Sequence, residues 1–139
     1  MTRPRMNGPA QCVLAAAIAI VTGSACSMQT PAQHADTRRN EMLASYPPGT
    51  TTRADVVARM GHDPDVTASR PAAGWQSLGS RAAARALASE GRTGMMVAKV
   101  ERYSGPDMQT SSFLSLNRNW FFYDATDRVI DVEWEYMSD

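Results

Sequence analysis

The sequence predicts a single α+β domain of two layers, in which two short helices pack on a three-stranded antiparallel sheet. An Ala/Arg-rich helix is inserted in the chain between the second of these helices and the first strand. Three observations support this prediction: a capped apolar stripe at residues 52–61, an alanine-rich stretch at residues 79–94, and apolar/acidic alternation at residues 129–136. A chain of 139 residues has room for one core. Its 14 basic and 14 acidic residues balance, so overall charge does not indicate a nucleic acid partner.

The N-terminus has the order of a secretory signal. Arg3 and Arg5 precede an apolar run at residues 12–21, and small residues at positions 22–25 lead to Cys26. A membrane-spanning helix needs about 20 mostly apolar residues, and this run is interrupted earlier. Residues 1–25 are therefore expected to be removed, either as a plain signal peptide or as a lipoprotein signal.

Cys26 favours the lipoprotein alternative. The sequence GSAC at residues 23–26 resembles the lipobox, whose cysteine is acylated and becomes the first residue of the mature chain, although Gly23 stands where a leucine-like residue is usual. Cys12 would leave with the signal, so acylation of Cys26 would remove the one remaining free thiol. In lipoproteins of this kind, a serine such as Ser27 after the cysteine implies transfer to the outer membrane.

Residues 26–36 are expected to be an acylated, flexible tether, and residues 37–139 the folded domain. The tether is polar, carries Pro31 and shows neither helical nor strand periodicity. His34 lies in it without neighbouring ligands, so a solvated side chain is expected rather than a metal ligand. A first short helix is predicted at residues 37–45, ended by the turn residues that follow it.

The stretch PPGTTTRADVVARMGHDP predicts a second helix. Thr52 and Asp55 have the spacing of a capping box, and Gly61 suits the left-handed position that closes a helix. The alternative of a phosphate-binding loop fails, because no Lys-Ser/Thr pair follows the glycine and no strand precedes it. The motif therefore indicates a short helix that packs through an apolar stripe formed by Val56, Val57 and Met60.

The C-terminal half predicts three strands, at residues 95–104, 119–123 and 129–136, with a turn at residues 124–127 that makes the last two a hairpin. In the last strand one set of alternating residues is expected to be buried and the other to face water as an acidic stripe. The acids also suit a docking face for a basic partner. The expected buried set is Ile130, Val132, Trp134 and Tyr136, and the expected exposed set is Asp131, Glu133 and Glu135.

The inserted segment at residues 79–94 favours a helix because of its six alanine and leucine residues between positions 82 and 88. Arg81 and Arg85 stand four apart on one face, and Arg92 follows Gly91. Two interpretations stay open: a solvated, weakly packed helix, or a basic face that contacts anionic lipid head groups or an acidic partner.

The motif GTTTRADVVARMGHDP resembles that of the SmpA/OmlA (BamE-like) family of small outer-membrane lipoproteins. Thr52, Val56, Met60 and Gly61 match its internal spacing, while one extra residue lies in each flanking turn, where insertions are tolerated. The resemblance implies two helices on a three-stranded sheet, and a lipid-anchored protein on the periplasmic face of the outer membrane.

The same resemblance implies a noncatalytic accessory role in envelope integrity and β-barrel protein assembly. It implies outer-membrane assembly proteins as partners, together with anionic phospholipid, and no cofactor. The residues expected to contact a partner are Tyr46, Thr52, Arg53 and Val56 around the helix motif, and Arg102 and Tyr103 near a strand edge.

An enzyme is not expected. The sequence contains no GxSxG or HExxH motif, and His62 after Gly61 is explained as an exposed residue at a helix C-terminus, where a cation is favoured. The alternative function from another class is a periplasmic inhibitor or binding protein, since β-lactamase inhibitory proteins have a similar helix-on-sheet unit. A hydrolase is the third possibility.

Overall fold

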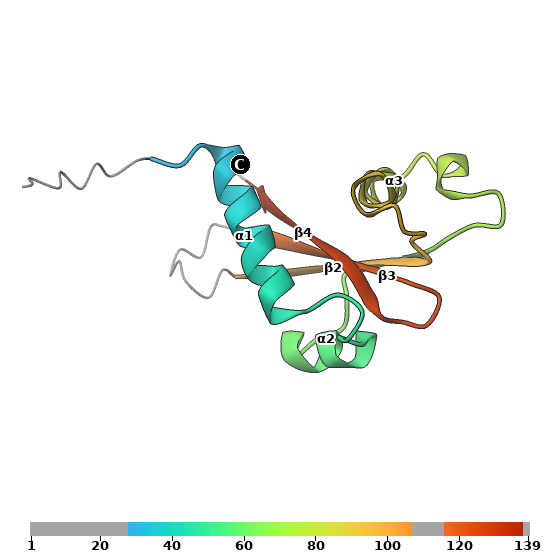
Figure 1. Cartoon of the computed structure of the whole chain (residues 1–139), viewed down its shortest axis with the longest axis horizontal. Helices are drawn as coiled ribbons and strands as arrows, with labels where there is room; N and C mark the ends of the chain where they lie inside the picture. The colour runs from blue at the N-terminus through green and yellow to red at the C-terminus, as the bar shows by residue number, and fades with distance from the viewer. Residues whose placement is uncertain (1–27, 107–115, 138–139) are drawn as a thin grey trace, which may run out of the picture.

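The computed structural model describes residues 28–106 and 116–137 and shows a mixed α+β domain (Figure 1). Its sheet has four antiparallel strands in the order β1-β2-β3-β4, which is a simple meander. The strands are β1 (Val66–Ser69), β2 (Lys99–Pro106), β3 (Leu116–Tyr123) and β4 (Val129–Met137). The helices of the described part are α1 (Pro31–Ser45), α2 (Arg53–Met60) and α3 (Arg81–Thr93), with a short 3-10 turn, η1 (Trp75–Ser77).

Helices pack on both faces of the sheet, so the predicted two-layer arrangement is wrong. On β3, Trp120 and Phe122 belong to a core shared with α3 and η1, whereas Phe121 and Tyr123 belong to a second core beneath α1 and α2. Successive strand residues point to opposite faces, which explains how one aromatic strand serves two cores. Figure 1 shows α3 on one side of the sheet and α2 on the other.

The second predicted helix is confirmed. The Thr52 hydroxyl accepts from the Asp55 amide at 3.2 Å, and the Thr52 amide donates to the Asp55 carboxylate at 2.9 Å, which completes the capping box. Gly61 closes α2 with φ at +75°, in the left-handed region that glycine adopts without steric cost.

Helix α1 begins at Pro31, six residues before the predicted start at Thr37, so the second half of the predicted tether is helical. The reason is a second capping box: Thr30 accepts from the Gln33 amide, and the Gln33 side chain accepts from the Thr30 amide. Proline is favoured in the first helical turn, where no intrahelical amide donor is needed. The predicted signal peptide and Cys26 lie outside the described residues.

The sheet differs from the prediction in the number of strands and in their bounds. Strand β1 is an additional strand, β2 runs from Lys99 to Pro106 rather than over residues 95–104, and β3 begins at Leu116 rather than at Asn119. Two amides just before β2 bond to α3 instead of to a strand: Met95 donates to the Thr93 hydroxyl and Val97 to the Glu90 carboxylate. Met95 and Met96 are consequently exposed.

The β3–β4 hairpin is confirmed, but its facing is only partly as predicted. A register shift between Phe122 and Tyr123 places Ile130 in the core under α3, while Val132 packs in the core under α1 and α2. Trp134 is buried as expected. The predicted burial of Tyr136 lies outside the described side chains.

Candidate functional site

The acidic residues of β4 do not face water, which corrects the sequence prediction. Helix α3 lies over them, and its arginines form ion pairs with them. Arg92 contacts Asp131 at 2.8 Å, and Arg85 contacts Glu135 at 3.1 Å. The remaining pairs of this ladder join Arg81 to Glu135, Arg85 to Glu133 and Arg92 to Glu133.

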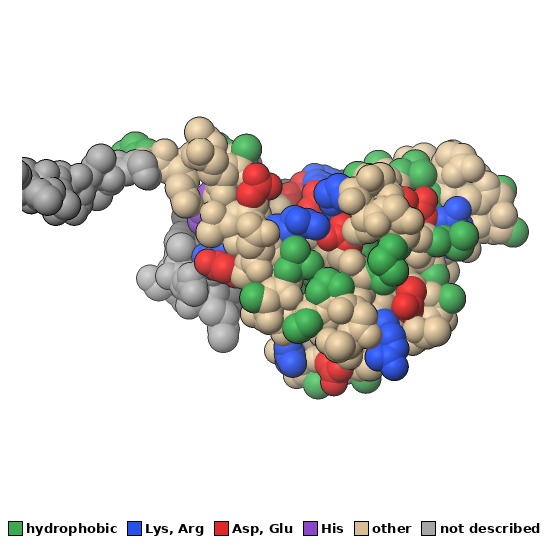
Figure 2. Space-filling view, in the orientation of Figure 1, with side chains coloured by type: hydrophobic (Ala, Val, Ile, Leu, Met, Phe, Trp, Pro, Cys, Tyr) green, Lys and Arg blue, Asp and Glu red, His purple; other side chains and the backbone are tan. Residues whose placement is uncertain are grey.

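Helix α3 therefore is not the weakly packed helix that the first interpretation expected. Ala82, Ala83 and Ala86 are buried against the sheet, and the charged side chains close over β4. The arginines predicted to meet lipid head groups, Arg81, Arg85 and Arg92, direct their guanidinium groups at carboxylates of the same chain. Figure 2 shows basic and acidic side chains meeting in the space between α1 and α3.

Asp131 joins the helices of both faces through one carboxylate. Its side chain is 1% exposed and accepts from Arg39 of α1 at 2.6 Å, from Ser89 of α3 at 2.8 Å and from Arg92. Burial alone would raise the pKa of Asp131, but hydrogen bonds from Arg92, Ser89 and Arg39 outweigh it and hold the pKa below its ordinary value. Arg39 also donates to the Val132 carbonyl at 3.1 Å and so covers the edge of β4.

A second buried carboxylate, Glu101, lies under α2. It accepts from Arg53 at 2.6 Å and from the Tyr103 hydroxyl at 2.9 Å. Burial first, and then the bond to Glu101, raises the pKa of Tyr103 above its ordinary value. The Tyr123 hydroxyl is also buried near these groups, close enough for the Glu101 charge to raise its pKa after burial, but it forms no well-aligned hydrogen bond.

Most of the predicted contact residues have structural roles. Val56 and Tyr103 are fully buried in the core, so the prediction that they contact a partner is wrong. Thr52 caps α2, and Arg53 pairs with Glu101. Arg102 lies on the opposite face from Tyr103, with its guanidinium 5.8 Å from the centre of the Trp120 ring. The two neighbours thus do not form one contact surface.

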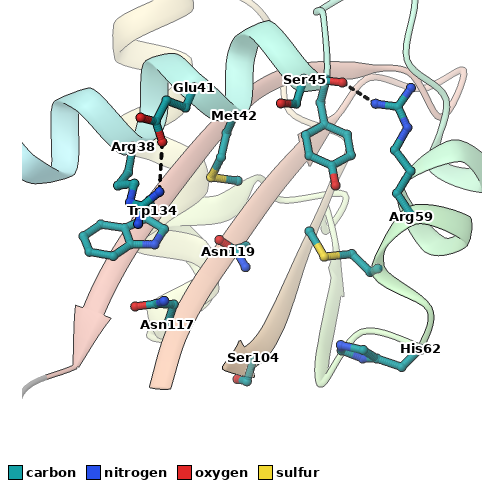
Figure 3. Close-up of a pocket in the computed structure, with 13 residues that line it drawn as sticks. Arg38, Glu41, Met42, Ser45, Arg59, His62, Ser104, Asn117, Asn119 and Trp134 are labelled. Carbon is teal, nitrogen blue, oxygen red and sulfur yellow. Dashed lines mark hydrogen bonds and ion pairs between the residues drawn. The ribbon is translucent and has the colours of Figure 1, made fainter. Parts of the chain in front are cut away.

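Tyr46 is the predicted contact residue that borders a cavity. A groove of about 490 Å³ lies between α1, the end of α2 and the open end of the sheet (Figure 3). A volume of this size is in the range of ligand-binding pockets. Its lining comprises Arg38, Glu41, Met42, Ser45, Tyr46, Arg59, Met60, His62, Ser104, Gly105, Asn117, Asn119 and Trp134.

The floor of the groove is polar and its walls are largely apolar. Asn117 and Asn119 of β3 continue the face on which Phe121 is buried, so the aromatic row becomes an amide row at the groove. Asn117 is 4% exposed, and its Oδ1 accepts no hydrogen bond from the part of the chain that the structure describes. A buried carbonyl oxygen without a donor is costly, so this oxygen is a candidate acceptor for a group bound in the groove.

The rim carries charge on two sides. On α1, Arg38 and Glu41 form an ion pair at 3.0 Å. Across the groove, Arg59 donates to the Ser45 carbonyl and lies 5.1 Å from the centre of the Tyr46 ring, as an interaction between a cation and an aromatic face. His62 is exposed beside it, as predicted, and its ring contacts Tyr103 edge-on.

Sequence reasoning did not identify this groove. Its only local signal is the pair of asparagines at alternate positions before an aromatic strand, and asparagine is uncommon in strands. The walls come from segments far apart in the chain, so their meeting depends on how α1 packs across β4. The side chains provide amides, thioethers, aromatic faces and two guanidinium groups, which together can hold a ligand.

Comparison with known families, with characterised proteins and with solved structures found no match. The resemblance to the SmpA/OmlA family therefore stays a prediction from the sequence motif. Among residues 28–106 and 116–137, no helix combines the length and apolar character needed to cross a membrane. In the same ranges, no three His, Cys, Asp or Glu side chains gather as a metal site would require.

Proposed function

We propose that this chain is a noncatalytic interaction module, held by acyl groups on Cys26 at the periplasmic face of the outer membrane. It acts there as an accessory lipoprotein in envelope integrity and β-barrel protein assembly. The observation that carries the proposal is the groove between α1 and the sheet, whose buried Asn117 has no donor among the described residues. A groove of this size with a buried acceptor at its floor supports a role in binding.

Electrostatic pairing within the domain supports a preformed binding surface. Asp131 ties α1 to α3 across β4, and Glu101 ties α2 to β2 through Arg53. The helices that border the groove are therefore held in place before any partner arrives. Preorganisation of this kind lowers the ordering cost of binding.

The start of α1 supports close tethering. Four residues separate Cys26 from Pro31, and a chain segment of five residue steps spans at most about 18 Å. An acyl anchor on Cys26 would confine α1, and with it one wall of the groove, near the bilayer. Confinement raises the effective concentration of a membrane-bound partner, so weak contacts become sufficient.

The proposal is tested by affinity capture from membranes with the tagged chain and a Cys26→Ser variant. The matched control is Cys12→Ser, which removes a thiol without touching the proposed anchor. We expect Cys26→Ser to lose membrane association and its envelope partners, and Cys12→Ser to keep both. Equal partner recovery by both variants would contradict tethering and favour a soluble periplasmic inhibitor or binding protein.

A further inference from the structure

The most informative unsatisfied group in the described residues is the Oδ1 atom of Asn117. It is an acceptor at the floor of the groove, in a side chain that is 4% exposed, and no described group, in residues 28–106 and 116–137, donates to it. A ligand that completes this site must therefore carry an N–H or O–H donor. A phosphate group is a poor match, because at neutral pH its oxygens are acceptors and its one titrating proton is the only donor that it has.

The spacing of the two asparagines further limits the class of ligand that fits the groove. Asn117 and Asn119 are two residues apart on β3, and their side chains share one face (Figure 3). Two residues of strand span about 7 Å, which is also the distance between equivalent peptide groups in an extended chain. A carboxamide offers both a donor and an acceptor, so each asparagine can pair with one peptide group of such a chain.

The walls indicate which side chains the ligand carries. Met42 of α1, Met60 of α2 and Tyr46, which follows α1, all line the groove. Thioethers and an aromatic ring form an adaptable apolar surface suited to a large aliphatic or aromatic side chain. The lining is therefore matched to one apolar anchor next to the polar floor.

The charges favour an acidic neighbour for that anchor. Glu41 is paired with Arg38, whereas Arg59 has no carboxylate within ion-pair distance among the described residues. His62 lies on the same side of the groove. Among the described lining residues two arginines, Arg38 and Arg59, face one acid, Glu41, and this excess of basic groups is complementary to an aspartate or glutamate.

We propose that the groove between α1 and the β2–β4 face binds an extended peptide segment of a partner protein, with an acidic residue beside a large apolar one. The inference rests on the proposed function and names the chemistry of its partner. The asparagines bond the peptide backbone, the methionines and Tyr46 hold the apolar side chain, and Arg59 pairs with the acid.

Gly105 provides a way to block the groove with little disturbance of the fold. It lies on β2 opposite Asn117, it lines the groove, and a Cβ added there meets no atom within 4 Å. Gly105→Leu therefore places a side chain in the groove. The matched control is Gly91→Leu on α3, which also has open space at its Cβ and lies away from the groove.

The probe is a phage-displayed library of random nine-residue peptides, selected on the full chain purified from membranes in detergent. The most enriched peptide is then synthesised and titrated by fluorescence polarisation. We expect an acidic residue next to an apolar one in the enriched set, about tenfold weaker binding by Gly105→Leu, and unchanged binding by Gly91→Leu. No enrichment, or equal binding by both variants, would overturn the proposal.

Charge reversal keeps the test decisive if Gly105→Leu folds poorly. Arg59→Glu changes an exposed side chain. This variant should bind the enriched peptide about tenfold more weakly than the unchanged chain does, and should bind a peptide with lysine in place of the acid more tightly than the unchanged chain does. If Arg59→Glu left the affinity for both peptides unchanged, the proposed pairing of Arg59 with the acidic residue would be refuted. The groove would instead be assigned to lipid if the chain bound no peptide but bound vesicles of phosphatidylcholine and phosphatidylglycerol, and if Gly105→Leu weakened that vesicle binding.

Failure of this inference is distinguishable from failure of the proposed function. If Gly105→Leu recovers the same envelope partners from membranes as the unchanged chain, the groove is not the docking site, while tethered binding stands. If Cys26→Ser recovers them all as well, the tethered function itself fails, whatever the peptide titration gives.

Discussion

The carboxylate of Asp131 provides the strongest test of how the layers are held together. Asp131→Asn keeps the size of the side chain but removes its charge, and leaves Arg39 and Arg92 facing a neutral amide. The bond from Ser89 also loses its ionised acceptor. The change therefore weakens the contact of α1 and of α3 with β4 at the same time.

The magnitude follows from burial. Removing one partner of a buried ion pair costs about 3–5 kcal/mol. The two arginines are 28% and 35% exposed and can regain water, so we expect the lower end, about 3 kcal/mol. For a domain of roughly 100 residues this corresponds to a fall in Tm of about 15 °C.

Thermal unfolding at pH 7, followed by circular dichroism, measures this loss. The matched control is Asp127→Asn: Asp127 is 52% exposed, pairs with Lys99 at 2.7 Å, and has φ at +59°, which asparagine tolerates. We expect the control to lose less than about 1 kcal/mol, as exposed ion pairs do. Equal losses in the two variants would refute the role assigned to Asp131.

Three further predictions concern stability. Thr52→Ala should cost about 1 kcal/mol in urea unfolding because it removes the α2 cap, whereas Thr52→Ser should stay near the unchanged chain. Arg53→Leu leaves the buried Glu101 charge unpaired and should cost about 3 kcal/mol, part of which Glu101→Gln in the same chain should restore; no recovery in the double variant would contradict the pairing. The pKa of Asp131 is lower in the folded than in the unfolded chain, so the stability that its charge contributes is present above pH 3.8 and is lost as pH falls below that value. The difference in unfolding free energy between the unchanged chain and Asp131→Asn should therefore shrink from pH 7 to pH 3. A difference that stays constant would contradict this role of the Asp131 charge.

Features with local causes were predictable from the sequence. The Thr52–Asp55 capping box and Gly61 set the bounds of α2 without help from the rest of the chain. The β3–β4 turn is similar, because Asp124 accepts from the amides of Thr126 and Arg128 within the turn itself. The early start of α1 was also visible in the sequence, in Thr30 and Gln33, but was not recognised.

Features with distant causes were not predictable. The acids of β4 resemble a wet face, and only the position of α3 shows that arginines cover them. Glu101 alternates with apolar residues as an exposed acid would, yet Arg53, 48 positions earlier in the chain, makes its burial tolerable. Strand β1 is short, and its pairing with β2 defines it.

The candidate site is also a feature with distant causes. Asn117 is an ordinary polar residue in the sequence, and its oxygen stands out only once the fold shows that the side chain is buried. Val56 and Tyr103 show the opposite error, because a motif resemblance suggested contact residues where packing requires core residues. Burial, which decides both cases, is a property of the whole fold.

The intact mass of the chain extracted from bacterial membranes tests the account most directly, because it reports cleavage and acylation together. The account predicts the mass of residues 26–139 plus the acyl groups on Cys26. A mass equal to the unmodified residues 26–139, or to a chain cut elsewhere, would contradict a lipid-tethered interaction module.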